Sequence, residues 1–140
     1  MQAYLLFGDE EYLDMFVELY SAVMHHHKTP ELLGGYQWLA DVHTVEGYVV
    51  GPWVSSLSAF WPGMQVLAGQ MEDAKHLHCN YTNIWKNFAA LPELFSIDGS
   101  RRHPQQSGYP LRPELIESNF FLYAATKDPY YLQVGQSVPP

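Results

Sequence analysis

The segment YPLRPELIES, residues 109–118, decides how the rest of the sequence is interpreted. Pro113 suits the first turn of a helix, where its missing N–H costs no hydrogen bond and its φ angle is already helical. Glu114 and Glu117 are three residues apart, so they lie on one face of that turn. Arg112 comes just before the turn, where its guanidinium can reach a carboxylate or a polar ligand. The segment therefore predicts a helix that starts with one basic and two acidic side chains.

Two interpretations of these charges stay open on the pattern alone. Acidic residues in the first turn of a helix are common because they complement the helix dipole. In this interpretation Glu114 and Glu117 only cap a helix, whose buried part would be residues 120–123. In the other interpretation these carboxylates and Arg112 line a binding or catalytic site.

The composition restricts the class of protein. The 140 residues are 47% hydrophobic and 15% aromatic, which is too apolar for a disordered segment. The net charge of −8 argues against nucleic acid and anionic membranes as main partners, because phosphates bind clusters of Lys and Arg. No apolar run reaches the roughly 18 residues that a membrane-spanning helix needs. The first seven residues lack the basic and apolar regions of a signal peptide.

Cysteine and histidine predict no metal site in this sequence. The single cysteine, Cys79, excludes an internal disulfide and a cysteine-built zinc site. His76 and His78 are two positions apart on a predicted helix and cannot converge on one ion, so we expect His78 and Cys79 to pack in the core. Residues 80–82 (NYT) fit the acceptor rule for N-glycosylation, which matters only if the chain is luminal.

Periodic apolar residues predict a mostly helical chain. In residues 70–88 the apolar side chains recur every three or four positions, which is the strongest periodic signal in the sequence. Asp9 predicts the N-cap of an earlier helix. Ser55 or Ser56 is expected to cap another helix, in which Pro62 causes a kink or ends the first part.

Two segments differ from the helical ones. Residues 36–50 combine Tyr, Trp and Val with glycine, and they predict a short β-hairpin or an extended loop. Residues 92–108 are rich in Pro, Ser, Gln and Gly, so we expect a loop that leads to Arg112.

A helix, a tight turn and a second helix are predicted three times. The turns are at Phe7-Gly8-Asp9, Ala68-Gly69-Gln70 and Thr126-Lys127-Asp128. They are spaced by about 60 residues, and the first and last are followed by the same Asp-x-x-Tyr-Leu pattern. A helical hairpin that recurs at this period predicts a helical array, solenoid or toroid.

Three segments resemble signatures of glycoside hydrolase family 47, the class I α-1,2-mannosidases. They are FGDEEYLDMF at 7–16, SAFWPGMQVLAG at 58–69 and YPLRPELIESNFFLYAATKDPYYLQVG at 109–135. With ALPE at 90–93, the sequence is most similar to the branch of ER degradation-enhancing α-mannosidase-like proteins. The resemblance covers nearly the whole chain, with the three motifs in the family's order.

The resemblance implies an all-α fold that is part of an (α/α)7 barrel, with residues 1–140 as a single incomplete segment of the catalytic domain. It implies inverting hydrolysis, in which one carboxyl group protonates the leaving oxygen and another activates water. It assigns the general base to Glu114, and it places Arg112, Pro113 and Glu117 in the mannose site. The catalytic acid is expected before Met1.

The resemblance also implies a Ca²⁺ ion, held mainly through waters and a threonine that is expected beyond Pro140. The implied substrates are high-mannose N-glycans on misfolded glycoproteins in the endoplasmic reticulum lumen or secretory pathway. ER oxidoreductases or quality-control proteins are further implied partners. Isolated residues 1–140 are expected to be inactive, because a site of this kind needs acid, base and metal in register.

One position departs from the family pattern. The branch usually reads Asp-Ser-Leu-Gln-Ala-Phe where this sequence has SSLSAF at 55–60, so Ser55 replaces an acid. Three functions therefore stay open: an α-mannosidase that trims N-glycans for ER-associated degradation, a non-catalytic mannose-binding protein on the same scaffold, and a helical protein with an unrelated role.

Overall fold

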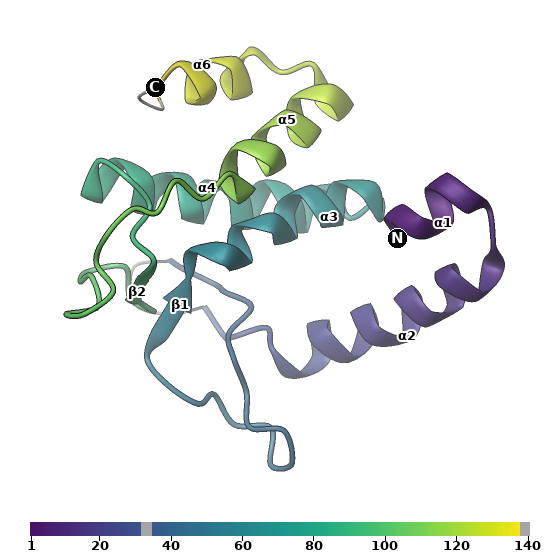
Figure 1. Cartoon of the computed structure of the whole chain (residues 1–140), viewed down its shortest axis with the longest axis horizontal. Helices are drawn as coiled ribbons and strands as arrows, with labels where there is room; N and C mark the ends of the chain where they lie inside the picture. The colour runs from purple at the N-terminus through teal and green to yellow at the C-terminus, as the bar shows by residue number, and fades with distance from the viewer. Residues whose placement is uncertain (32–34, 138–140) are drawn as a thin grey trace.

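The computed structural model describes residues 1–31 and 35–137, most of which are helical (Figure 1). The elements in chain order are α1 (Gln2–Phe7), α2 (Glu10–His26), β1 (Trp53–Ser55), the 3-10 helix η1 (Ser56–Phe60), α3 (Trp61–Leu67), α4 (Met71–Phe88), β2 (Leu94–Ser96), α5 (Glu114–Thr126) and α6 (Pro129–Ser137). The predicted all-α class is confirmed. None of the helices in the described ranges is both long and apolar enough to cross a membrane.

The three predicted helical hairpins are present, and each turn contains a residue in the left-handed conformation. These residues are Gly8, Gly69 and Lys127, with φ angles of 71°, 78° and 58°. In the first hairpin the Asp9 side chain caps α2 by accepting a hydrogen bond from the Glu11 N–H at 3.1 Å. Lys127 shows that a non-glycine residue can end a helix in this way, at an energetic cost of about 1–2 kcal/mol.

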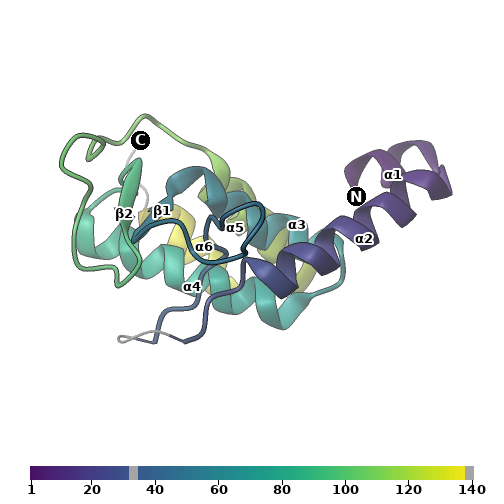
Figure 2. The same ribbon diagram turned by 90° about the horizontal axis from the view of Figure 1, so that it is seen from below.

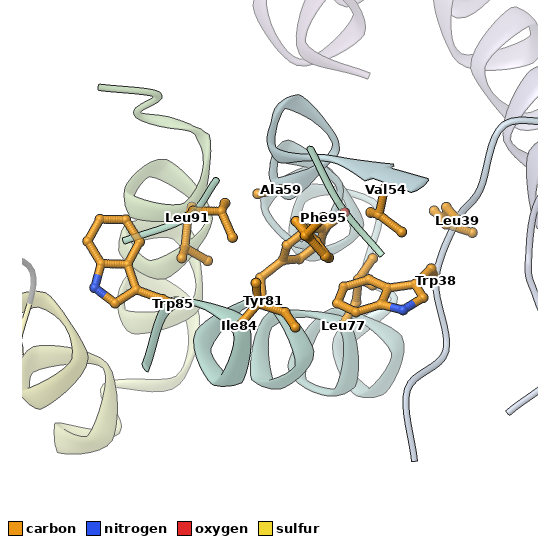
Figure 3. Packing of buried hydrophobic residues seen from close by; sticks show 11 residues of the cluster. Trp38, Leu39, Val54, Ala59, Leu77, Tyr81, Ile84, Trp85, Leu91 and Phe95 are labelled. Atoms are coloured by element: carbon orange, nitrogen blue, oxygen red, sulfur yellow. The ribbon is translucent and has the colours of Figure 1, made fainter. Parts of the chain in front are cut away.

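The centre of the core is the face of α4 that the periodicity predicted. Tyr81 and Ile84 are fully buried, and they pack against residues from the loops and strands on either side (Figure 3). Trp38 lies edge-on to Tyr81 at 5.0 Å between ring centroids, and its indole N–H donates to the Ile97 carbonyl at 2.7 Å. This cluster anchors the 36–50 segment and β2 to α4.

Two burial predictions are wrong. Cys79 is exposed, because on a helix it points about 100° away from its buried neighbour His78. Of residues 120–123, only Leu122 is fully buried, whereas 63% of Phe120 is exposed. The apolar face of α5 is therefore narrower than the run of aromatic residues indicates.

The 36–50 segment is an extended loop, in agreement with the prediction. Val42 and Val49 form an antiparallel bridge within it, and Leu39 forms another with Lys28. The regular sheet lies elsewhere and was not predicted. β1 pairs antiparallel with β2, and Ser55 is opposite Leu94. Three-residue strands are too short for an alternating pattern to reveal them, so the expectation of a loop throughout 92–108 is wrong at β2.

Pro62 divides the helical segment after Ser55, as expected. The 3-10 helix η1 ends at Phe60, and Pro62 lies in the first turn of α3, where it needs no hydrogen-bond donor. Helix α3 contacts both α4 and α5, while the α1–α2 hairpin extends away from them (Figure 2).

Helices α3 and α5 approach closely at Gly63. A Cβ atom there would lie 3.0 Å from the Phe121 ring and 3.2 Å from the Cα of Ser118. The Gly63 N–H donates to Ser118 Oγ at 2.9 Å, and Ser118 Oγ donates to the Ala59 carbonyl at 2.6 Å. These contacts fix the start of α5 against η1 and α3.

Candidate functional site

The candidate site lies at the N-terminal end of α5. The helix begins at Glu114, one residue later than predicted, and the Pro113 carbonyl accepts the first hydrogen bond, from Glu117 N–H at 2.9 Å. Leu111 has a φ angle of 56°, which is uncommon for a residue with a side chain. Unusual backbone conformations of this kind occur often at functional sites. Leu111 directly precedes Arg112 in the sequence.

Arg112 is held by a carboxylate that the sequence pattern did not assign to the site. Its Nε and Nη2 donate to Oε2 and Oε1 of Glu93 at 3.0 and 2.7 Å. This two-point geometry fixes the plane of the guanidinium. Hydrogen bonds from Arg112 are the main reason that the pKa of Glu93 lies below its ordinary value. In the sequence Glu93 stands out only as part of ALPE, and no spacing rule links two residues that are 19 positions apart.

Glu93 also contacts the start of η1. Ser56 is buried, and its hydroxyl donates to Glu93 Oε2 at 3.3 Å. The Ser56 N–H donates to the Glu93 carbonyl at 3.0 Å. The pairing of Ser55 with Leu94 in the β1–β2 sheet brings the two residues together. Glu93 therefore connects the β1–η1 junction to Arg112.

The carboxylate of Glu114, the predicted base, has a buried oxygen that no described residue contacts by a hydrogen bond. Its Oε2 is buried and accepts no hydrogen bond from any residue in the described ranges. A buried oxygen of this kind is costly unless water or a ligand satisfies it. Nearby Tyr109 has a pKa above its ordinary value, first because it is buried and then because of the charge on Glu114.

Glu117, the predicted sugar contact, is exposed and lines a cavity of about 560 Å³ between α1, α2, α3 and α5. Most of the lining is apolar, with aromatic rings from Phe60, Trp61 and Phe121. The cavity lining does not include Arg112, Pro113 or Glu114. The four predicted residues thus share one helix end, but they face different surroundings.

The described residues do not form a metal site. No group of three or more His, Cys, Asp or Glu in residues 1–31 and 35–137 could hold an ion. The acidic residues at the start of α5 have Arg112 beside them and are too few for an all-protein calcium site, which takes 6–8 oxygen ligands. The residues present therefore do not fit a complete Ca²⁺ site.

Comparison with known proteins gives one family. The model of glycosyl hydrolase family 47 matches residues 1–138. The chain is 44% identical over 137 residues to "Alpha-mannosidase I MNS4" from Arabidopsis thaliana, covering 97% of this chain and 21% of that protein. It is 37% identical over 132 residues to "ER degradation-enhancing alpha-mannosidase-like protein 2" from Homo sapiens, covering 94% and 22%.

A third relative is "ER degradation-enhancing alpha-mannosidase-like protein 1" from Schizosaccharomyces pombe, which is 38% identical over 135 residues. That alignment covers 96% of this chain and 16% of the relative. The chain thus spans about a fifth of the length of the relatives it matches.

Proposed function

This chain belongs to glycosyl hydrolase family 47, and from that premise we propose that the full-length protein is a mannosyl-oligosaccharide α-1,2-mannosidase-like protein. It trims N-glycans of misfolded glycoproteins for ER-associated degradation. The names of the similar proteins support this proposal. The observation that carries it is the buried Oε2 of Glu114, which has no hydrogen-bond partner among residues 1–31 and 35–137, two positions after a fixed Arg112.

In the proposed reaction Glu114 is the general base. A water molecule donates a proton to the Glu114 carboxylate, and its oxygen forms a bond to the anomeric carbon. The bond from that carbon to the leaving oxygen breaks, and a second carboxyl group protonates this oxygen. Arg112, Pro113 and Glu117 contact the mannose. The second carboxyl group is proposed to come from another part of the full-length protein.

Calcium is proposed as a ligand of the full-length protein and takes no part in the reaction steps described above. We expect the full-length protein to bind Ca²⁺ through a direct protein ligand outside this chain. The ion would also bind sugar hydroxyls, because Ca²⁺ prefers hard oxygen ligands. The proposed reaction has no step that runs through the ion, because the described residues offer no complete site for it. Since the second carboxyl group and this ligand are both proposed to come from other parts of the full-length protein, we expect the isolated 140-residue chain to hydrolyse nothing.

The second candidate function is a non-catalytic mannose-binding protein of glycoprotein quality control. Ser55 favours it, because the related branch usually has an acid there. The Ser55 hydroxyl accepts a hydrogen bond from the Leu57 N–H at 3.2 Å and so caps η1. Aspartate caps helices equally well, so the exchange removes a negative charge and keeps the local fold.

Both candidates place the protein in the endoplasmic reticulum lumen or the secretory pathway, with high-mannose N-glycans as ligands. ER oxidoreductases and quality-control proteins are proposed as further partners. Neither nucleic acid nor a membrane surface is proposed, because the net charge is −8.

The test is mannose release from a high-mannose N-glycan by the full-length protein. An inverting enzyme acting on an α-linkage releases β-mannose first, which proton NMR of the anomeric hydrogen detects before the anomers equilibrate. Glycan binding without release would select the non-catalytic candidate. Early release of α-mannose would refute the inverting mechanism, and neither release nor binding would refute both candidates.

A further inference from the structure

Within the part of the chain that the structure describes, the charges of two carboxylates act on Arg112, and it forms an ion pair with one of them. Its pKa is raised first by the hydrogen bonds to Glu93, and the charges of Glu93 and Glu114 add to this. Glu114 is two residues away along the chain, and its Oε2 has no hydrogen-bond partner in the described ranges. The carboxylate that Arg112 pairs with therefore decides whether Glu114 is held in an ion pair or stays available to water and ligands.

Glu93 is well fixed for this task. Its N–H donates to the Gly108 carbonyl at 2.9 Å, and its own carbonyl accepts from the Ser56 N–H at 3.0 Å. Its carboxylate accepts two hydrogen bonds from Arg112 and one from the Ser56 hydroxyl. Ser56, which follows β1, and Gly108 and Arg112, which follow β2, thus hold Glu93 in place together.

The geometry of the pair leaves part of Arg112 available. A guanidinium has five N–H donors, and the contact through Nε and Nη2 uses two of them. The other three donate to no residue in the described ranges and can serve a second partner. The side chain of Arg112 remains 34% exposed and that of Glu93 26%, so a ligand can reach the pair.

We propose that Glu93 is a positioning residue, which holds the Arg112 guanidinium away from Glu114 and directs its remaining donors to a sugar hydroxyl. The proposal rests on the proposed function, because it assigns Glu114 to water activation and Arg112 to the sugar. Without the carboxylate at position 93, Arg112 turns to Glu114 and forms an ion pair with it. The paired Glu114 then accepts a proton from water less readily, and the donors of Arg112 are lost to the sugar.

A purely structural role for Glu93 makes a different prediction. In that case the pair only ties the loop before α5 to the sheet, and its loss lowers the fraction of folded protein. A smaller folded fraction reduces the apparent kcat and leaves KM unchanged. The positioning role changes KM as well, because the sugar contact itself is lost.

The experiment compares full-length wild type with Glu93→Gln, Glu93→Asp and Glu72→Gln on a high-mannose N-glycan. Glu72 is a matched control, since it forms an exposed ion pair with Lys75 at 2.8 Å on α4. We expect Glu93→Gln to raise KM on the order of tenfold and to lower kcat as well. Glu93→Asp restores KM to within a few-fold of wild type, and Glu72→Gln leaves both constants unchanged.

An unchanged KM in Glu93→Gln, with kcat lowered only in proportion to the folded fraction, overturns the proposal. A crystal structure of full-length Glu93→Gln gives an independent readout. Arg112 paired with Glu114 in that structure supports the proposal, and Arg112 still in place beside residue 93 overturns it. If wild type releases no mannose, the catalytic function fails, and the crystal structure still decides the role of Glu93.

Discussion

Ser118 provides the sharpest test of how the site is held in place. The side chain is fully buried, and its hydroxyl joins α5 to two other backbone segments. It donates to the Ala59 carbonyl at 2.6 Å and accepts from the Gly63 N–H at 2.9 Å. Ser118→Ala removes both hydrogen bonds and leaves two buried backbone groups without partners. Each such group costs about 1–3 kcal/mol, so we expect the two together to cost roughly 2–6 kcal/mol.

The assay is urea unfolding of the full-length protein, together with hydrogen exchange of the Gly63 amide. Ser21→Ala is the control, because Ser21 is exposed on α2. We expect Ser118→Ala to unfold at lower urea concentration and its Gly63 amide to exchange faster, while Ser21→Ala stays within about 0.5 kcal/mol of wild type. Equal unfolding midpoints for Ser118→Ala and Ser21→Ala would show that this hydrogen-bond pair does not hold α5.

Three further predictions concern α4 and η1. Burial lowers the pKa of His78 to about 4 and outweighs its polar contact with Asn119, so the unfolded state binds a proton that the folded state does not. The free energy of unfolding should therefore fall by about 3 kcal/mol in total as the pH drops from about 6.5 to about 4. Urea titrations at several pH values should show that His78→Gln lacks this pH dependence and that the exposed control His76→Gln keeps it. The same pH dependence in both variants would refute the role of His78. Asn80 is only 4% exposed and donates to the Gln37 carbonyl at 2.9 Å, so mass spectrometry of secretory-pathway protein should find it unmodified, and a glycan there would contradict this packing. Ser55→Asp should keep the unfolding midpoint within about 0.5 kcal/mol, because aspartate also caps η1, and a larger loss would show that Ser55 does more than cap.

Local signals in the sequence predicted most of the helical framework. The period of α4 identified its buried face, and Asp9 marked the start of α2. Pro62 marked the change from η1 to α3. These features depend on neighbours a few residues away, which a sequence pattern records directly.

The missed features depend on contacts between distant segments. Strand β2 exists because three residues pair with β1, about forty positions earlier in the chain. Glu93 joins the site through Arg112 and Ser56, which no local pattern links to it. The exposure of Cys79 shows the reverse case, in which a chemical preference for burial yields to the geometry of the helix.

Mannose release by full-length Glu114→Gln, beside wild type and the control Glu72→Gln, shows whether Glu114 is the general base. Removal of a general base typically costs 10²–10⁴-fold in rate, so we expect release by Glu114→Gln to fall by about this factor. Glycan binding should be retained, and Glu72→Gln should match wild type, because Glu72 pairs with Lys75 on the exposed surface of α4. Release by Glu114→Gln at the wild-type rate would contradict the assignment of Glu114 as the base.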